Sequence, residues 1–161
     1  MPLSKDSIPH CLTDPLPSSL LLLFEHVPDT YFFIKDRQSR FLHANRALLL
    51  RLGLKEVSDI RGTADHDRYP PHVADQLVES DRRVMEAGTP LVDHPEVLFD
   101  HAGKLEWFST SKYPIEGDRG DAQGVVGITR SYSARRHRQV PAEPVAAGHA
   151  IALLEAEQAL E

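Results

Sequence analysis

The chain has 161 residues, a length that suits a single domain with a hydrophobic core of its own. Its formal net charge of −6 disfavours direct DNA binding by this chain, because an acidic surface repels phosphate backbones. The single cysteine, Cys11, excludes an internal disulfide and a cysteine-based zinc site, and it fits a reducing cytoplasm.

The N-terminal part of the sequence predicts a helix followed by a two-stranded hairpin. Residues 1–16 contain scattered prolines and are interpreted as a flexible lead-in. Residues 17–27 predict a short helix with a serine cap and an apolar body, too short to span a membrane. The β-branched and aromatic residues 30–34 predict a strand, and 40–43 predict a second strand after the turn at 35–39.

Helical segments are predicted next. Asn45 is a good cap for a helix over 46–52, which ends at a glycine. Residues 54–69 are polar and rich in turn formers. The pair Pro70–Pro71 predicts the start of a longer helix, because proline suits the first turn, and Gly88 predicts its end.

Three further strands are predicted at 91–99, 105–115 and 125–132. Two strands, several helices and three strands in this order favour an antiparallel sheet with helices on one face, in the α+β class. Residues 134–161 predict a linker followed by a helix rich in alanine and leucine.

Residues 18–133 resemble a PAS domain throughout, and we therefore assign 17–133 to one PAS sensor domain. Ser39 departs from the family pattern, since many members have glycine in this turn. The resemblance rests on the order and spacing of short segments: Phe33–Asp36, Arg40–Leu42, Asn45–Ala47, Leu52–Leu54, Gly62–Asp65, Tyr69–Pro71, Asp81–Gly88, Trp107–Pro114 and Gly124–Arg130.

The resemblance implies a five-stranded sheet in the order 2-1-5-4-3, with helices that enclose a small cavity on one face. It implies a signalling domain and no enzyme. The single thiol and the short apolar runs predict a cytoplasmic location. The ending 127–132, followed by basic residues, is similar to PAS domains fused to AraC-type transcriptional regulators, which bind DNA through a C-terminal domain absent from this chain. The alternatives are a sensor module of a histidine kinase or diguanylate cyclase, a ligand-free interaction domain, and a small enzyme with a cone-shaped sheet.

No cofactor is expected from the residues that such families use. Flavin photosensors of similar fold have a reactive cysteine, whereas the matching stretch 63–67 contains no thiol, and Thr129 stands near the position of their flavin-sensing glutamine. Haem-binding members use a histidine of the long helix, and none lies between His72 and His94. The run Asp65–Asp67 has metal-ligand chemistry, but we interpret it as capping and solvated groups and predict no metal site.

Strand alternation predicts which side chains face the cavity. Most of them would form plain core, but the polar His43, Ser109 and Thr129 need partners there, and we hypothesise a small metabolite that is partly polar and partly apolar. The ligand itself is unknown. The predicted pocket residues are Phe33, Phe41, His43, Leu48, Leu77, Val97, Phe99, Trp107, Ser109 and Thr129.

The opposite face of the sheet is predicted to be apolar, which is typical of an interface. We expect the N-terminal helix to pack across that face, in its own subunit or a partner's, and to form a homodimer. The predicted interface residues are Leu20, Leu21, Leu23, Phe24, Phe32, Phe108, Val126 and Ile128.

The run Asp81–Arg83, in the long helix, is interpreted as a solvated helix face.

Overall fold

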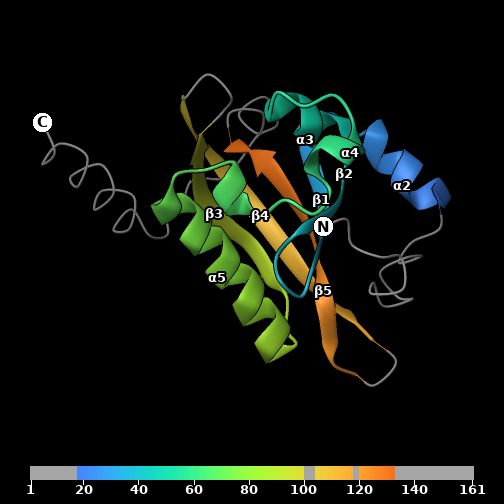
Figure 1. Cartoon of the computed structure of the whole chain (residues 1–161), viewed down its shortest axis with the longest axis vertical. Coiled ribbons are helices and arrows are strands. Elements are labelled where there is room, and N and C mark those ends of the chain that lie inside the picture. Colours follow the sequence, from blue (N-terminus) through green and yellow to red (C-terminus); the bar gives the residue numbers. More distant parts are fainter. Residues whose placement is uncertain (1–17, 100–103, 118–119, 133–161) are drawn as a thin grey trace, which may run out of the picture.

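A computed structural model describes residues 18–99, 104–117 and 120–132, shown in colour in Figure 1, with the side chains of 18–20 left undescribed. Every structural statement below concerns these residues. The predicted lead-in at 1–16 and the predicted linker and helix at 134–161 lie outside them.

Five antiparallel strands form one sheet, as predicted. The strand order is β2-β1-β5-β4-β3, so the first hairpin pairs through β1 with the last strand of the chain. The strands are β1 (Thr30–Asp36), β2 (Phe41–Ala44), β3 (Leu91–Phe99), β4 (Leu105–Glu116) and β5 (Ala122–Ser131).

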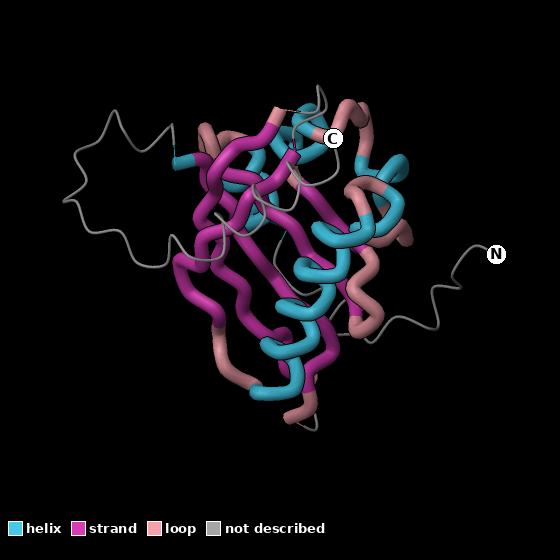
Figure 2. Tube along the Cα trace, turned by 90° about the vertical axis from the view of Figure 1, so that its left-hand side faces the viewer, coloured by secondary structure: helices cyan, strands magenta, loops and turns pink. Residues whose placement is uncertain are grey.

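The helices divide between the two faces of the sheet. The inner face carries α3 (Arg46–Arg51), α4 (Val57–Ile60), the 3-10 turn η2 (Asp65–Asp67) and α5 (Pro71–Ala87), and Figure 2 shows α5 lying along the sheet. The outer face carries α2 (Ser18–Glu25). Within the described ranges, no helix combines the length and hydropathy needed to cross a membrane.

Asn45 fastens three elements together. Its side-chain Oδ1 accepts hydrogen bonds from the backbone N–H groups of Phe32 and Leu48, so it caps α3 as predicted. Its Nδ2 donates to the backbone carbonyls of Phe24 and Thr30. Asn45 is fully buried, and these four bonds satisfy its amide while holding β1, α3 and the end of α2 together.

Apolar side chains pack on both faces of the sheet. On the inner face, Phe33, Phe41 and Val125 pack against α3, α4 and α5. On the outer face, the Phe24 ring of α2 stacks on Phe32 with centroids 4.2 Å apart. The sheet is therefore covered on both sides where β1, β2 and β5 meet.

The backbone imposes special requirements at two positions, Gly127 in the sheet and Ser39 in its first turn. A Cβ on Gly127 would lie 2.3 Å from the Phe33 ring on the neighbouring strand, so only glycine leaves room for that ring. Ser39 adopts φ of +56°, the left-handed conformation that glycine adopts most readily. The turn thus has the geometry that glycine would provide, although a serine occupies it.

Local irregularities change which face some side chains occupy. In β2, Ile34 pairs with His43 while Lys35 pairs with Phe41, so Leu42 is an extra residue and the alternation shifts by one. In β3, a similar shift lies between Leu91 and His94, where Asp93 has a positive φ. Strict alternation therefore gave the wrong face for His43 and for parts of the later strands.

Candidate functional site

A cavity of about 40 Å³ lies between the inner face of the sheet and the helices. One water molecule needs roughly 10–15 Å³ on this measure, so the space fits a few waters or a compact molecule. Its apolar lining comes from Phe33, Phe41, Leu48, Leu77 and Leu98, and its aromatic, polar and charged lining from Tyr31, Lys35, Arg51, Asp65, Tyr69, Glu96, Thr110, Lys112 and Thr129.

Five of the ten predicted pocket residues line this cavity: Phe33, Phe41, Leu48, Leu77 and Thr129. Thr129 also has the hydrogen-bond partner that a polar group there requires. Its hydroxyl lies 2.9 Å from that of Thr110 on the neighbouring strand.

The other five predicted residues do not line the cavity. His43 contacts the Phe32 ring on the outer face because of the bulge in β2. In β4 the inward residues are Phe108, Thr110 and Lys112, so Trp107 and Ser109 face outward, and Val97 faces outward with its pairing partner Trp107. Phe99 is half-buried and packs beside the cluster that contains Leu98 and Phe108.

The inward face of β4 was predicted wrongly because apolar and polar residues do not alternate clearly along this strand. Trp107 and Phe108 are both large and aromatic, and the next three residues, 109–111, are all small and polar. The structure settles the phase through burial: Phe108 has none of its surface exposed, whereas Trp107 has 43% exposed. The Ser109 hydroxyl finds its partner outside the cavity, in the Asp93 carboxylate.

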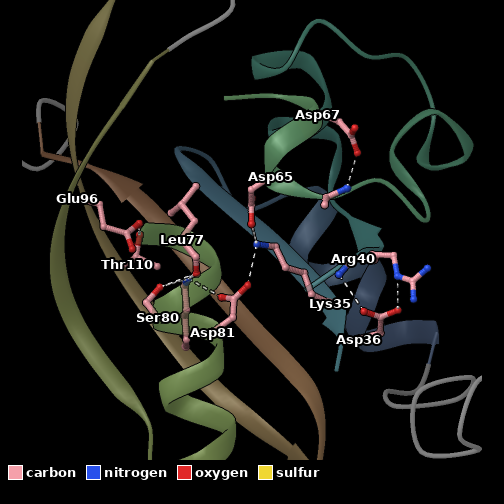
Figure 3. A network of polar contacts seen from close by, with 12 residues as sticks. Lys35, Asp36, Arg40, Asp65, Asp67, Leu77, Ser80, Asp81, Glu96 and Thr110 are labelled. Atoms are coloured by element: carbon pink, nitrogen blue, oxygen red, sulfur yellow. Dashed lines mark hydrogen bonds and ion pairs between the residues drawn. The ribbon is translucent and has the colours of Figure 1, made fainter. Parts of the chain in front are cut away.

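The main feature missed from the sequence is a set of buried charges around the cavity. Lys35 was assigned to a turn, but it continues β1 and points inward with Phe33. Its ammonium donates to Asp65 of η2 at 2.5 Å and to Asp81 of α5 at 3.0 Å, as Figure 3 shows. All three side chains are almost fully buried.

A second buried lysine completes this group. Lys112 of β4 donates to the other oxygen of Asp81 at 2.6 Å, to the Ser80 hydroxyl at 2.6 Å and to the carbonyl of Leu77 at 3.2 Å. Asp81 therefore bridges two lysines from opposite halves of the sheet. Lys35, Asp65, Asp81 and Lys112 are called the buried charge cluster below.

The pKa values show which forms the cluster stabilises. Burial by itself lowers the pKa of Lys35, but the charges and hydrogen bonds of Asp65 and Asp81 outweigh it, and the net pKa lies above its usual value. Burial tends to raise the pKa of Asp81, yet Lys35 and Lys112 hold it below its usual range. Both residues therefore stay charged at neutral pH.

A polar group lies near the cluster on the sheet side of the cavity. The Thr110 hydroxyl donates to the Glu96 carboxylate at 2.7 Å, and it also bonds to the Thr129 hydroxyl. Burial raises the pKa of Tyr69 to about 12, with a further contribution from the charge of Asp65. The Tyr69 hydroxyl consequently remains protonated and able to donate at neutral pH.

Two positional signals were available for the buried charge cluster. Lys35 is two residues after Phe33, so extending the strand by one pleat places it on the same face. Asp81 is four residues after Leu77 and three before Val84, which is the spacing of the buried face of α5. The interpretation of Asp81 as solvated was therefore wrong, although Arg82 and Arg83 do form exposed pairs with Glu79.

The run Asp65–Asp67 does not act as one group. Asp65 is buried against Lys35, the exposed His66 ring contacts Asp75 at 2.8 Å, and Asp67 accepts from the Ala64 backbone N–H. Among the described residues, no cluster of three or more histidine, cysteine or acidic side chains has metal-binding geometry.

The predicted interface residues fall into three groups. Phe32, Val126 and Ile128 form the apolar outer face, and Leu21 and Phe24 of α2 pack against it within the same chain. Phe108 belongs to the inner core, so its assignment to the interface was wrong. Leu23 is 63% exposed, and the side chain of Leu20 lies outside the described residues.

Comparison with known proteins identifies one family. The family described as PAS fold matches residues 24–137, which is most of the chain. A comparison with curated proteins finds no match.

Several solved structures are similar to the chain. A structure described as VqmA bound to DPO is 26% identical, with a TM-score of 0.62, over 73% of this chain and 58% of that one. The Vibrio cholerae VqmA dimer, in a study of LuxR-type receptors, is 27% identical, with a TM-score of 0.61, over 72% of this chain and 52% of that one. A PAS domain from Colwellia psychrerythraea is 16% identical with a TM-score of 0.61, over 73% of this chain and 98% of that one, which shows the fold alone. This chain thus spans little more than half the length of the two VqmA structures.

Proposed function

The chain belongs to the PAS family, and from this premise we propose that it is the signal-sensing domain of a transcriptional regulator, which binds a small molecule in its inner cavity and does no chemistry of its own. The observation that carries the proposal is the cavity itself. It combines an apolar wall with buried polar groups that converge on one space, which is the usual composition of a ligand site.

The VqmA structures support the ligand-binding part of the proposal. The structure bound to DPO is 26% identical to this chain and has the same fold. A related structure is described as a VqmA–ligand–DNA complex, so a domain of this fold occurs in a protein that binds a ligand and DNA. We propose that this protein likewise binds a small molecule through its PAS domain and regulates transcription.

The cavity is well placed to pass a signal on. Its buried charge cluster joins β1, η2, α5 and β4, so a ligand that contacts Lys35 or Lys112 bears on four elements together. A ligand changes the state of a protein only by binding two arrangements unequally. We propose that the two arrangements differ in how the helices of the inner face sit on the sheet.

The regulator part of the proposal has two finer points. One is a homodimer formed through α2 and the outer face, which the exposed leucines of α2 support. The other is the type of DNA-binding region, which the sequence resemblance indicates as AraC-type, whereas the Vibrio cholerae VqmA study concerns LuxR-type receptors. The reading frame beyond Glu161 decides between these two types, and a kinase or cyclase region there would contradict both.

A ligand-free interaction domain is the second candidate, and the small volume of the cavity favours it. In that case the buried charge cluster would serve only to hold the helices on the sheet.

Ligand binding separates the two candidates. Native mass spectrometry of freshly purified protein should show a bound small molecule, and calorimetric titration with DPO should give a saturable signal. If the protein carries nothing and DPO produces no heat and no change in thermal stability, the sensor proposal is wrong and the ligand-free domain is favoured.

A further inference from the structure

Arg51, the last residue of α3, lies against two aromatic rings at one wall of the cavity. Its guanidinium carbon is 4.2 Å from the centroid of the Phe108 ring and 5.3 Å from that of Tyr31. Only 8% of its side chain is exposed. Arginine interacts favourably with aromatic rings at such distances, and contact with two rings restricts where its donors lie.

One end of this guanidinium has a partner and the other does not. Nη1 donates to the Glu106 carboxylate at 3.2 Å, whereas Nη2 is buried and has no hydrogen-bond partner among the described residues. Buried polar groups are nearly always paired, and guanidinium donors cannot be removed by deprotonation. Because Arg51 lines the cavity, a molecule in that cavity is a candidate for the missing acceptor.

The surrounding charges determine what kind of acceptor is favoured. Both buried lysines are already neutralised by Asp65 and Asp81, and Arg51 faces Glu106. The remaining charged side chain of the lining is Glu96, which pairs in register with Phe108 on the adjacent strand. An anionic ligand would meet the Glu96 carboxylate without a free lysine to compensate, while a neutral N–H or O–H would find an acceptor there.

We propose that Arg51 anchors the ligand, and that the ligand is a small uncharged molecule of amide type. Its carbonyl oxygen accepts a hydrogen bond from Nη2 of Arg51, and its N–H donates to Glu96. The assignment rests on the proposed function, in that it requires the cavity to bind a small molecule.

Acetamide and acetate test the assignment, because they are alike in shape and differ in charge. Both are small enough for the cavity. NMR spectra of the backbone N–H groups of the full chain detect weak binding of either molecule. Acetamide should shift the signals of the cavity residues Thr110 and Thr129 in a saturable way, and equal concentrations of acetate should shift them less.

Variants of α3 test the role of the anchor. Arg51→Met should weaken acetamide binding at least tenfold, since it keeps the packing on Phe108 and removes the donors. Arg46→Met is the matched control, because Arg46 is an exposed arginine on the same helix. If Arg51→Met does not fold, Arg51→Lys keeps the charge beside Glu106 without the planar pair of donors, and it should also bind acetamide more weakly than the wild type.

The outcomes separate this assignment from the proposed function. If DPO or acetamide binds Arg51→Met as tightly as the wild type, Arg51 is not the anchor, while the sensor proposal stands. If acetate binds more tightly than acetamide, the ligand class is wrong. If neither probe nor DPO binds the wild-type protein, the proposed function and this assignment fail together.

Discussion

Asp81 is the residue on which the buried charge cluster depends. It offers one carboxylate oxygen to Lys35 and the other to Lys112, and both lysines lie in the interior with it. A buried ion pair adds little net stability when complete, because desolvation offsets the attraction, but it is costly to break. The cluster is therefore best understood through what its loss would do.

We expect Asp81→Asn to lower the free energy of unfolding by about 3–5 kcal/mol, the range for a buried pair that loses one partner. The asparagine oxygen can accept from one lysine, but its NH₂ group then faces the other lysine as a second donor. Urea unfolding at neutral pH measures the effect. Asp75→Asn is the matched control, because Asp75 is an exposed carboxylate of the same helix, and it should change stability by less than about 0.5 kcal/mol.

The pH dependence of the same pair of proteins gives a second measurement. Because the folded-state pKa of Asp81 is depressed, its contribution is present above the ordinary carboxyl pKa and is lost as the pH falls through the folded value. The stability difference between wild type and Asp81→Asn should thus shrink as the pH is lowered below about 4. A constant difference over that range would show that Asp81 does not act through its charge.

At the scale of elements, β5 links the hairpin to the rest of the sheet. It pairs with β1 on one side and β4 on the other, and its glycines permit close contact with β1. Gly127 accommodates the Phe33 ring, which also lines the cavity. The width of the cavity at this point is therefore set by the absence of a side chain on β5.

We expect Gly127→Ala to destabilise the protein by about 1–3 kcal/mol, as overpacking of a core does, and to push the Phe33 ring toward the cavity. The variant should also lose affinity for any molecule that the cavity binds. Thermal unfolding and the DPO titration measure the two effects. The double variant Gly127→Ala with Phe33→Leu should recover part of the stability, because leucine lacks the ring atoms that the new methyl would meet. Simple additivity of the two substitutions would contradict this account.

For the molecule as a whole, apolar surface remains exposed on the outer side. Leu22 and Leu23 of α2 are 61% and 63% exposed, although Leu21 and Phe24 of the same helix pack on the sheet. On β4, Trp107 and Tyr113 are also exposed. Such a surface beside an already covered apolar face is typical of an interface, and we propose that a second copy of the chain covers it.

The double variant Leu22→Asp with Leu23→Asp should be monomeric at concentrations where the wild type sediments as a dimer. Both side chains are largely exposed in the single chain, so the substitutions should not unfold it. The variant should still show a cooperative thermal unfolding transition. Leu50→Asp, which adds a charge at an exposed leucine of α3, serves as the control and should remain dimeric. Dimers that survive the double substitution would exclude α2 from the interface.

Much of the fold follows from local patterns. Asn45 caps α3, Pro71 and Gly88 bound α5, and β3 covers 91–99 as predicted, because caps, prolines and turn residues act within a few positions of the chain. The strand order was predicted from the resemblance, and the structure confirms it. The candidate site was predicted only in part, through residues such as Phe33 and Leu77 whose face has a clear apolar period.

By itself, the sequence determined the elements, their order and the covered faces of the strands with good alternation. The tertiary structure alone decided the phase of β4, the bulge that turns His43 outward, and the meeting of Lys35, Asp65, Asp81 and Lys112 in the interior. The physical reason is that a charged side chain is buried only when its partner is, and the partners here are 30 or more positions apart in the chain. Local propensity carries no information about such a pairing, whereas the packing of α5 and η2 on the sheet brings it about.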